Sequence, residues 1–109
     1  MSSDTHTLTR QGCPLHYWLD GQPDKPLLVM THGATLDHRM FAEQVSALKD
    51  DYRLLTWDMR GHGDSQPMGN AFTVPTAVDD LLAILDDVGA ENAIFLGQST
   101  GGYVVQELA

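Results

Sequence analysis

The sequence contains little cysteine and little positive charge, and each shortage excludes a class of protein. Cys13 is the one cysteine among 109 residues, so no disulfide can form within the chain. Six basic residues stand against fifteen acidic ones, which gives a formal net charge of −9. Because an acidic surface repels phosphate backbones and anionic lipids, nucleic acids and membrane surfaces are unfavourable partners.

Long hydrophobic runs and a secretory start are also missing. The apolar runs extend over only a few residues, far short of a membrane span. Residues 1–6 contain no basic residue and lead into no apolar stretch of the signal-peptide type. We therefore expect a cytoplasmic protein in which Cys13 is an ordinary thiol. With 42% hydrophobic and 19% charged residues, the composition is that of one globular domain.

Short apolar stretches predict the strands of a mostly parallel sheet. A loosely alternating segment from Thr7 to Leu19 breaks at Gly12-Cys13-Pro14, which predicts an antiparallel hairpin. A continuous apolar run, typical of a strand buried on both faces, follows at residues 27–30, and further buried strands are expected at residues 53–57 and 93–96. Since helical patterns separate these runs, the expected class is α/β, a β-hairpin followed by a parallel βαβαβ unit with helices on both faces.

Two helical patterns lie between the strands. Asp37 is expected to cap the first, whose apolar face carries Phe41, Val45 and Leu48. The second begins at a cap from Thr73 or Thr76 and ends at Gly89. Its inward face is expected to hold Val78, Leu81, Leu82, Leu85 and Val88, with Asp79, Asp80, Asp86 and Asp87 mainly outward.

The last apolar run leads into Gly97-Gln98-Ser99-Thr100-Gly101, which matches the pattern G-x-S-x-G. This turn lifts a serine above the sheet on a strained backbone, and side chains two positions away on either side would collide with the neighbouring strand and helix. Gly97 and Gly101 meet that requirement. The dipole of the helix that follows favours negative charge at the serine. In this strand-to-helix context the motif predicts Ser99 as a nucleophile.

Acyl transfer also needs two backbone N–H donors aimed at the developing negative charge. Thr100, which follows the nucleophile, supplies one of them. The other is expected from the loop His32-Gly33-Ala34-Thr35 after the first buried strand, where Ala34 is the best-placed candidate. Taken alone, His32-Gly33 is better explained as a turn that ends a strand.

Together, His32-Gly33, the Asp-Met-Arg-Gly-His-Gly-Asp-Ser segment of residues 58–65 and the turn at residues 97–102 resemble the α/β-hydrolase fold family. Their order and spacing match over essentially the whole chain. The resemblance implies that Ser99 is the nucleophile, that Ala34 and Thr100 donate to the oxyanion, and that His32 organises its loop. It also implies a mainly structural role for the Arg-Gly-His-Gly loop. Many members have histidine where this chain has Gln98, a position that varies.

In this family the acid and the histidine of the triad follow the serine in the chain. Residues 100–109 contain no histidine, and Glu107 is unsuited to the place of the acid. The five histidines precede Ser99 and are expected to be surface or loop residues. We therefore expect residues 1–109 to be the amino-terminal half of one domain, a fragment inactive alone, without strands six to eight, the cap, the acid and the histidine.

The expected function of the intact protein is that of a serine hydrolase. It would act through an acyl-serine intermediate on an ester-like bond of a small molecule, as a carboxylesterase, thioesterase or lactonase does. Ser99 separates it from members of the family that open epoxides with a nucleophilic aspartate. No cofactor is expected. The alternative is a non-catalytic fragment or binding module, and the open apolar edge at residues 93–96 would pair with the missing half or with a second copy.

Two further kinds of site fit the sequence poorly. For a dinucleotide site, Gly61 and Gly63 lack the third glycine of G-x-G-x-x-G, because position 66 is Gln66. The Ser99 turn also lacks the lysine of a phosphate-binding loop. For a metal site, the candidate ligands are His32, His38, His62 and Asp58. They are scattered along the chain without the spacing of a recognised metal motif, so no metal is expected.

Overall fold

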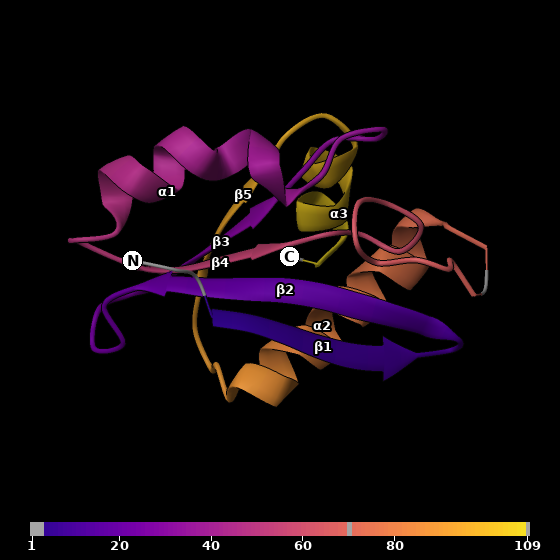
Figure 1. The fold of residues 1–109 in the computed structure, drawn as a ribbon, viewed down its shortest axis with the longest axis horizontal. Coiled ribbons are helices and arrows are strands. Elements are labelled where there is room, and N and C mark those ends of the chain that lie inside the picture. Colours follow the sequence, from indigo (N-terminus) through magenta and orange to yellow (C-terminus); the bar gives the residue numbers. More distant parts are fainter. Residues whose placement is uncertain (1–3, 70, 109) are drawn as a thin grey trace.

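The computed structural model describes residues 4–69 and 71–108, which form a sheet with helices on both sides (Figure 1). The strands are β1 (Asp4–Arg10), β2 (Cys13–Gly21), β3 (Leu27–Thr31), β4 (Arg53–Trp57) and β5 (Ile94–Gly97). The helices are the 3₁₀ turn η1 (His38–Phe41), α1 (Ala42–Leu48), α2 (Val74–Val88) and α3 (Thr100–Leu108). Within these described residues, no helix has the length and apolar character that crossing a membrane requires.

The strand order is β1-β2-β4-β3-β5. β2 is antiparallel to β1 and to β4, whereas β3 is parallel to both β4 and β5. The predicted hairpin and parallel βαβαβ unit are therefore confirmed. Because β3, β4 and β5 run in the same direction, their carboxyl ends meet at one edge of the sheet, where ligand sites of such folds lie.

The hairpin turn differs from its prediction by one or two residues. Gln11 and Gly12 form the turn, both with positive φ (49° and 80°), as a two-residue turn between right-twisted strands requires. Cys13 and Pro14 belong to β2 instead. Cys13 is fully buried, and its thiol donates a hydrogen bond to the carbonyl oxygen of Ser65 (3.2 Å). Burial raises the pKa of this thiol, so it stays protonated.

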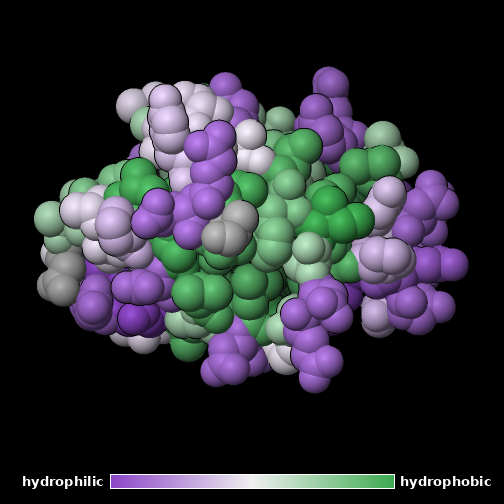
Figure 2. Space-filling view, turned by 180° about the vertical axis from the view of Figure 1, so that it is seen from behind, coloured by the Kyte–Doolittle hydropathy of each residue, from purple (hydrophilic) through white to green (hydrophobic). Residues whose placement is uncertain are grey.

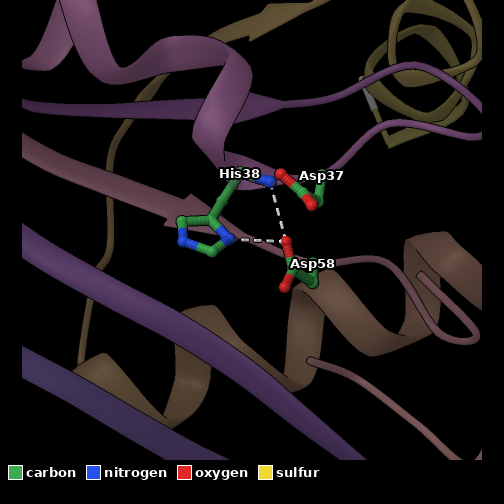
Figure 3. A group of neighbouring side chains, drawn as sticks. All are labelled: Asp37, His38 and Asp58. Carbon is green, nitrogen blue, oxygen red and sulfur yellow. Dashed lines mark hydrogen bonds and ion pairs between the residues drawn. The ribbon is translucent and has the colours of Figure 1, made fainter. Parts of the chain in front are cut away.

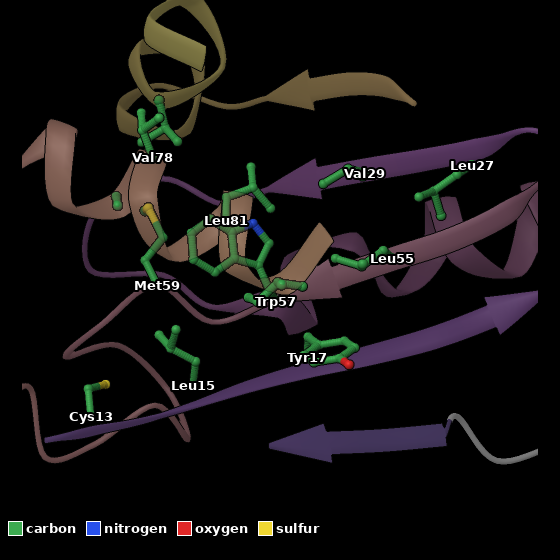
Figure 4. Packing of buried hydrophobic residues seen from close by; sticks show 13 residues of the cluster. Cys13, Leu15, Tyr17, Leu27, Val29, Leu55, Trp57, Met59, Val78 and Leu81 are labelled. Atoms are coloured by element: carbon green, nitrogen blue, oxygen red, sulfur yellow. The ribbon is translucent and has the colours of Figure 1, made fainter. Parts of the chain in front are cut away.

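Both faces of the central strands are covered, which explains their continuous apolar sequence. The larger core lies between the sheet and helices α2 and α3 (Figure 4), and the sheet contributes to it Leu15, Tyr17, Leu27, Val29, Leu55 and Trp57. The smaller core lies under α1 and consists of Leu28, Met30, Phe41 and Leu54. The side chains of successive β3 residues thus point alternately into the larger and the smaller core, because side chains alternate between the two faces of a strand.

α2 confirms the predicted caps but corrects two predicted orientations. Thr73 accepts a hydrogen bond from the N–H of Thr76, and Gly89 ends the helix with a φ of 77°. Leu82, expected to face inward, is 49% exposed. Asp80, expected to face outward, is fully buried. The buried stripe runs instead through Ala77, Val78, Asp80, Leu81 and Ile84.

Candidate active site

Ser99 lies between the last residue of β5 and the first residue of α3, with a φ of +54°. Residues other than glycine rarely adopt this conformation, so the backbone is strained at the serine. A Cβ atom at Gly97 would collide with the backbone of Gly101, and one at Gly101 would collide with the carbonyl oxygens of Thr31 and His32. Both glycines are therefore required by close packing, and the serine itself remains exposed.

This turn is docked onto the end of β3. The N–H of Gln98 donates to the carbonyl oxygen of Thr31 (3.1 Å), and Gly101 packs against the same carbonyl group. Thr31 is held in turn by the indole N–H of Trp57, which donates to its hydroxyl oxygen (2.9 Å). The position of Ser99 is thereby set by the two neighbouring strands, β3 and β4.

His32 is fully buried at the end of β3 and uses both ring nitrogens. The backbone N–H of Met59 donates to Nε2 (2.9 Å), so the ring proton lies on Nδ1, which donates to the carbonyl oxygen of Gly33 (2.7 Å). Burial lowers the pKa of His32, with the nearby His62 acting in the same direction. His32 is therefore a neutral residue that joins the loop after β3 to the loop after β4.

The hydrogen bonds of Gly33 set the direction of the next N–H group. Its carbonyl oxygen accepts from His32 and also from the N–H of Leu36 (3.2 Å), in a turn where Thr35 has a φ of 65°. In a trans peptide the C=O and N–H groups point in opposite directions. The N–H of Ala34 is therefore directed away from His32, and Ala34 is exposed.

Two backbone N–H groups beside the turn remain available. Thr100 begins α3, and the first N–H groups of a helix have no acceptor within it. Among the hydrogen bonds of residues 4–69 and 71–108, none uses the N–H of Ala34 or of Thr100. Gly33 packs directly against Gln98, so the structure brings the loop carrying Ala34 beside the turn carrying Ser99.

Histidines elsewhere in the described chain are engaged away from the serine. Nδ1 of His16 contacts the carbonyl oxygen of Pro14 (2.9 Å), and Nδ1 of His62 contacts that of Arg60 (3.1 Å). No hydrogen bond within the described residues joins a histidine to Ser99. His32 is a loop residue, as expected, because it follows the last residue of β3, and its ring is fully buried between the two loops that it connects.

Asp58 and His38, which the sequence analysis treated as scattered, are in direct contact (Figure 3). The buried Asp58 carboxylate accepts from the N–H (2.7 Å) and Nδ1 (2.8 Å) of His38 and from the N–H of Asp64 (2.8 Å). Arg39 binds Asp37 (2.6 Å) and lowers the pKa of that carboxyl to about 2. Oxygen and nitrogen atoms of Asp37, His38 and Asp58 lie within 4.8 Å of one another, a spacing at which they could hold a metal ion. Both carboxylates already accept hydrogen bonds from N–H groups of the chain.

Arg60 of the Arg-Gly-His-Gly loop makes a buried ion pair that sequence reasoning missed. Its Nε and Nη2 donate to the two carboxylate oxygens of Asp80 (2.9 and 2.8 Å), and Arg10 donates to one of them (2.7 Å). Asp80 raises the pKa of Arg60 further, so the guanidinium stays charged. Position 80 falls between the buried positions Ala77 and Ile84 of α2, and that spacing could have revealed it.

The model of the alpha/beta hydrolase fold family matches residues 26–109, the part that holds β3, β4, β5 and the serine turn. The sheet order, the strained serine and its two packed glycines agree with that match. The chain belongs to the α/β-hydrolase fold family.

Known proteins similar to this chain are hydrolases. The 3-oxoadipate enol-lactonase 1 of Acinetobacter baylyi is 39% identical over 103 residues, which cover 92% of this chain and 38% of the lactonase. Epoxide hydrolase A of Mycobacterium tuberculosis is 36% identical over 88 residues, covering 78% of this chain and 27% of that enzyme. The crystal structure of a hydrolase from Pseudomonas aeruginosa superposes with a TM-score of 0.90 at 37% identity, over 96% of this chain and 40% of that one. The chain thus spans less than half the length of each.

Proposed function

We propose that the protein is a serine hydrolase that cleaves an ester-like bond of a small molecule through an acyl-serine intermediate. The observation that carries this proposal is the strained, exposed Ser99 at the start of α3. Its hydroxyl group would attack the carbonyl carbon, and its proton would pass to a base. The N–H groups of Ala34 and Thr100 would then donate to the oxyanion of the tetrahedral intermediate.

Serine at position 99 favours ester, thioester or lactone hydrolysis over epoxide opening. In the family, epoxide-opening members use a nucleophilic aspartate at this place, and a serine alkyl ether formed from an epoxide would not be cleaved by water. The similarity to an enol-lactonase agrees with an acyl substrate. Within that class, we favour a small ester or lactone.

The base and its acid partner are proposed to come from polypeptide outside residues 1–109. Both ring nitrogens of His32 are engaged, and His38 is held by Asp58. A serine without a base stays protonated and is a poor nucleophile. We therefore propose that residues 1–109 alone react slowly, and that the additional polypeptide packs beside β5, the apolar one of the two edge strands of the five-stranded sheet.

The test is fluorophosphonate labelling with mass-spectrometric mapping of the labelled residue. It is applied to residues 1–109 and to the complete reading frame that contains them, each with its S99A variant. We expect label on Ser99 in the complete protein and much less in the short chain. S99A should abolish the label and lower hydrolysis of p-nitrophenyl acetate and small lactones by at least about a thousandfold.

Other results would contradict the proposal. If the complete protein is folded by circular dichroism but Ser99 does not label, the catalytic role fails and a binding module becomes the better reading. Equal labelling of the short chain would show that the base lies within residues 1–109. Turnover of an epoxide in place of the esters would refute the acyl-serine route.

A further inference from the structure

Gln98, the residue before the proposed nucleophile, has a side chain with an unusual position. Its backbone is fixed, because its N–H donates to Thr31 and its carbonyl oxygen accepts from the N–H of Gly101 (2.9 Å). Its amide nevertheless turns back over Gly33: a Cβ atom added there would collide with Oε1, and it would lie 3.2 Å from the backbone carbonyl oxygen of Gln98 and 3.3 Å from Cδ. Gln98, mainly through its side-chain amide, therefore occupies the space that a residue larger than glycine would need at position 33.

Gly33 is also held by a hydrogen bond from His32. The imidazole donates to the carbonyl oxygen of Gly33 (2.7 Å), and Gly33 is buried although Gln98 is exposed. This glycine has no left-handed φ, so backbone conformation alone does not require it. Its lack of a side chain is explained by contact with Gln98, and its carbonyl oxygen is held by the imidazole of His32.

We propose that Gln98 is a positioning residue for the reaction of Ser99, and this proposal rests on the function proposed above. The N–H of Thr100 is fixed to the serine turn, whereas the N–H of Ala34 is fixed to Gly33. The contact between Gln98 and Gly33 joins these two parts, so the amide sets the separation of the two donors. An oxyanion is stabilised only when both donors reach it, and small misplacements of such groups slow catalysis strongly.

The experiment compares Q98A and Q98M in the complete protein, with Q106A as the matched control, since Gln106 is an exposed glutamine on α3. For each variant, kcat and KM with p-nitrophenyl acetate, the rate of fluorophosphonate labelling at Ser99 and the melting temperature are measured. Q98A should lower kcat and the labelling rate about tenfold, with little change in KM or melting temperature. Q98M fills the same space and should recover most of the lost rate, and Q106A should match the wild type.

A double-mutant cycle tests the contact itself. G33A introduces a methyl group against the Gln98 amide, so it should slow labelling strongly and lower the melting temperature. In the Q98A background the amide is gone, and the same G33A change should cost at least about tenfold less in rate. G33A should also lower the melting temperature less in the Q98A background than in the wild type. This second measurement keeps the test valid if G33A folds poorly.

Three results would overturn the inference. Equal loss of rate from G33A in both backgrounds would show that the contact between Gln98 and Gly33 does not affect the reaction of Ser99. Q98A with unchanged kcat and labelling would show that the amide does not position the donors. A wild-type protein that fails to label at Ser99 would refute the proposed function and this inference together, whereas the first two results leave the function intact.

Discussion

At the scale of single residues, His32 shows how one neutral side chain connects two loops. Its Nε2 accepts from Met59 and its Nδ1 donates to Gly33, an arrangement that only the neutral ring can make. Protonation would remove the acceptor, leave the N–H of Met59 unpaired and place a charge in a buried site. The lowered pKa of His32 is the consequence of this environment.

The lowered pKa predicts the direction of a pH effect on stability. Below pH 6.5, the ordinary pKa of histidine, the unfolded chain binds a proton at His32 that the folded chain does not bind. The contribution of neutral His32 to the free energy of unfolding is therefore complete above pH 6.5 and is lost as the pH falls towards the pKa of the folded state. H32Q keeps an acceptor but does not titrate. Urea unfolding followed by tryptophan fluorescence should show wild-type stability falling from pH 7 to pH 5, and a shallower fall in H32Q. Parallel curves would contradict the assignment of this proton.

Other residue-level features separate into those that local sequence specifies and those that it does not. Gly97, Ser99 and Gly101 are neighbours in the chain, so one strand-to-helix turn determines their geometry, and it was predictable. The pair of Asp58 and His38 is separated by 20 positions and forms only because the loops after β3 and β4 meet. The catalytic roles of Ser99, Ala34 and Thr100 stay predictions until they are tested.

At the scale of elements, Asp80 ties three segments together. It lies on α2, accepts from Arg60 in the loop after β4, and accepts from Arg10 at the end of β1. The period of α2 makes the burial of position 80 predictable, but not the partners of the aspartate there. A carboxylate is normally placed outward by such patterns, and its partners lie 20 and 70 positions away.

Removing this carboxylate should destabilise the fold because a buried guanidinium loses its counter-charge. D80N is expected to lower the free energy of unfolding by roughly 3 to 5 kcal/mol. The matched control is D79N, an exposed neighbour on the same helix, which should change it by less than about 0.5 kcal/mol. Chemical denaturation of both variants measures the difference. Equal effects would show that the ion pair contributes nothing beyond the helix itself.

At the scale of the whole molecule, the described sheet ends in two edge strands, the largely polar β1 and the apolar β5. β1 and β2 form a hairpin at the first edge, while β5 pairs only with β3 in the described sheet. Ile94 is 51% and Leu96 46% exposed along β5. Seen from behind, hydrophobic residues gather across the middle of the molecule (Figure 2). An apolar strand with unpaired backbone groups is a template for pairing with another chain.

This edge predicts how residues 1–109 behave at high concentration. Two copies could pair through β5 despite their net charge, because each pairing satisfies backbone groups and buries Ile94 and Leu96. I94K adds a charge on the edge and should shift sedimentation towards the monomer while leaving circular dichroism unchanged. L82K removes an equally exposed leucine from α2 without touching the edge, so it should leave self-association as in the wild type. Equal suppression of self-association by both variants would instead assign it to general surface hydrophobicity. The complete protein should not associate in this way if its further polypeptide covers β5.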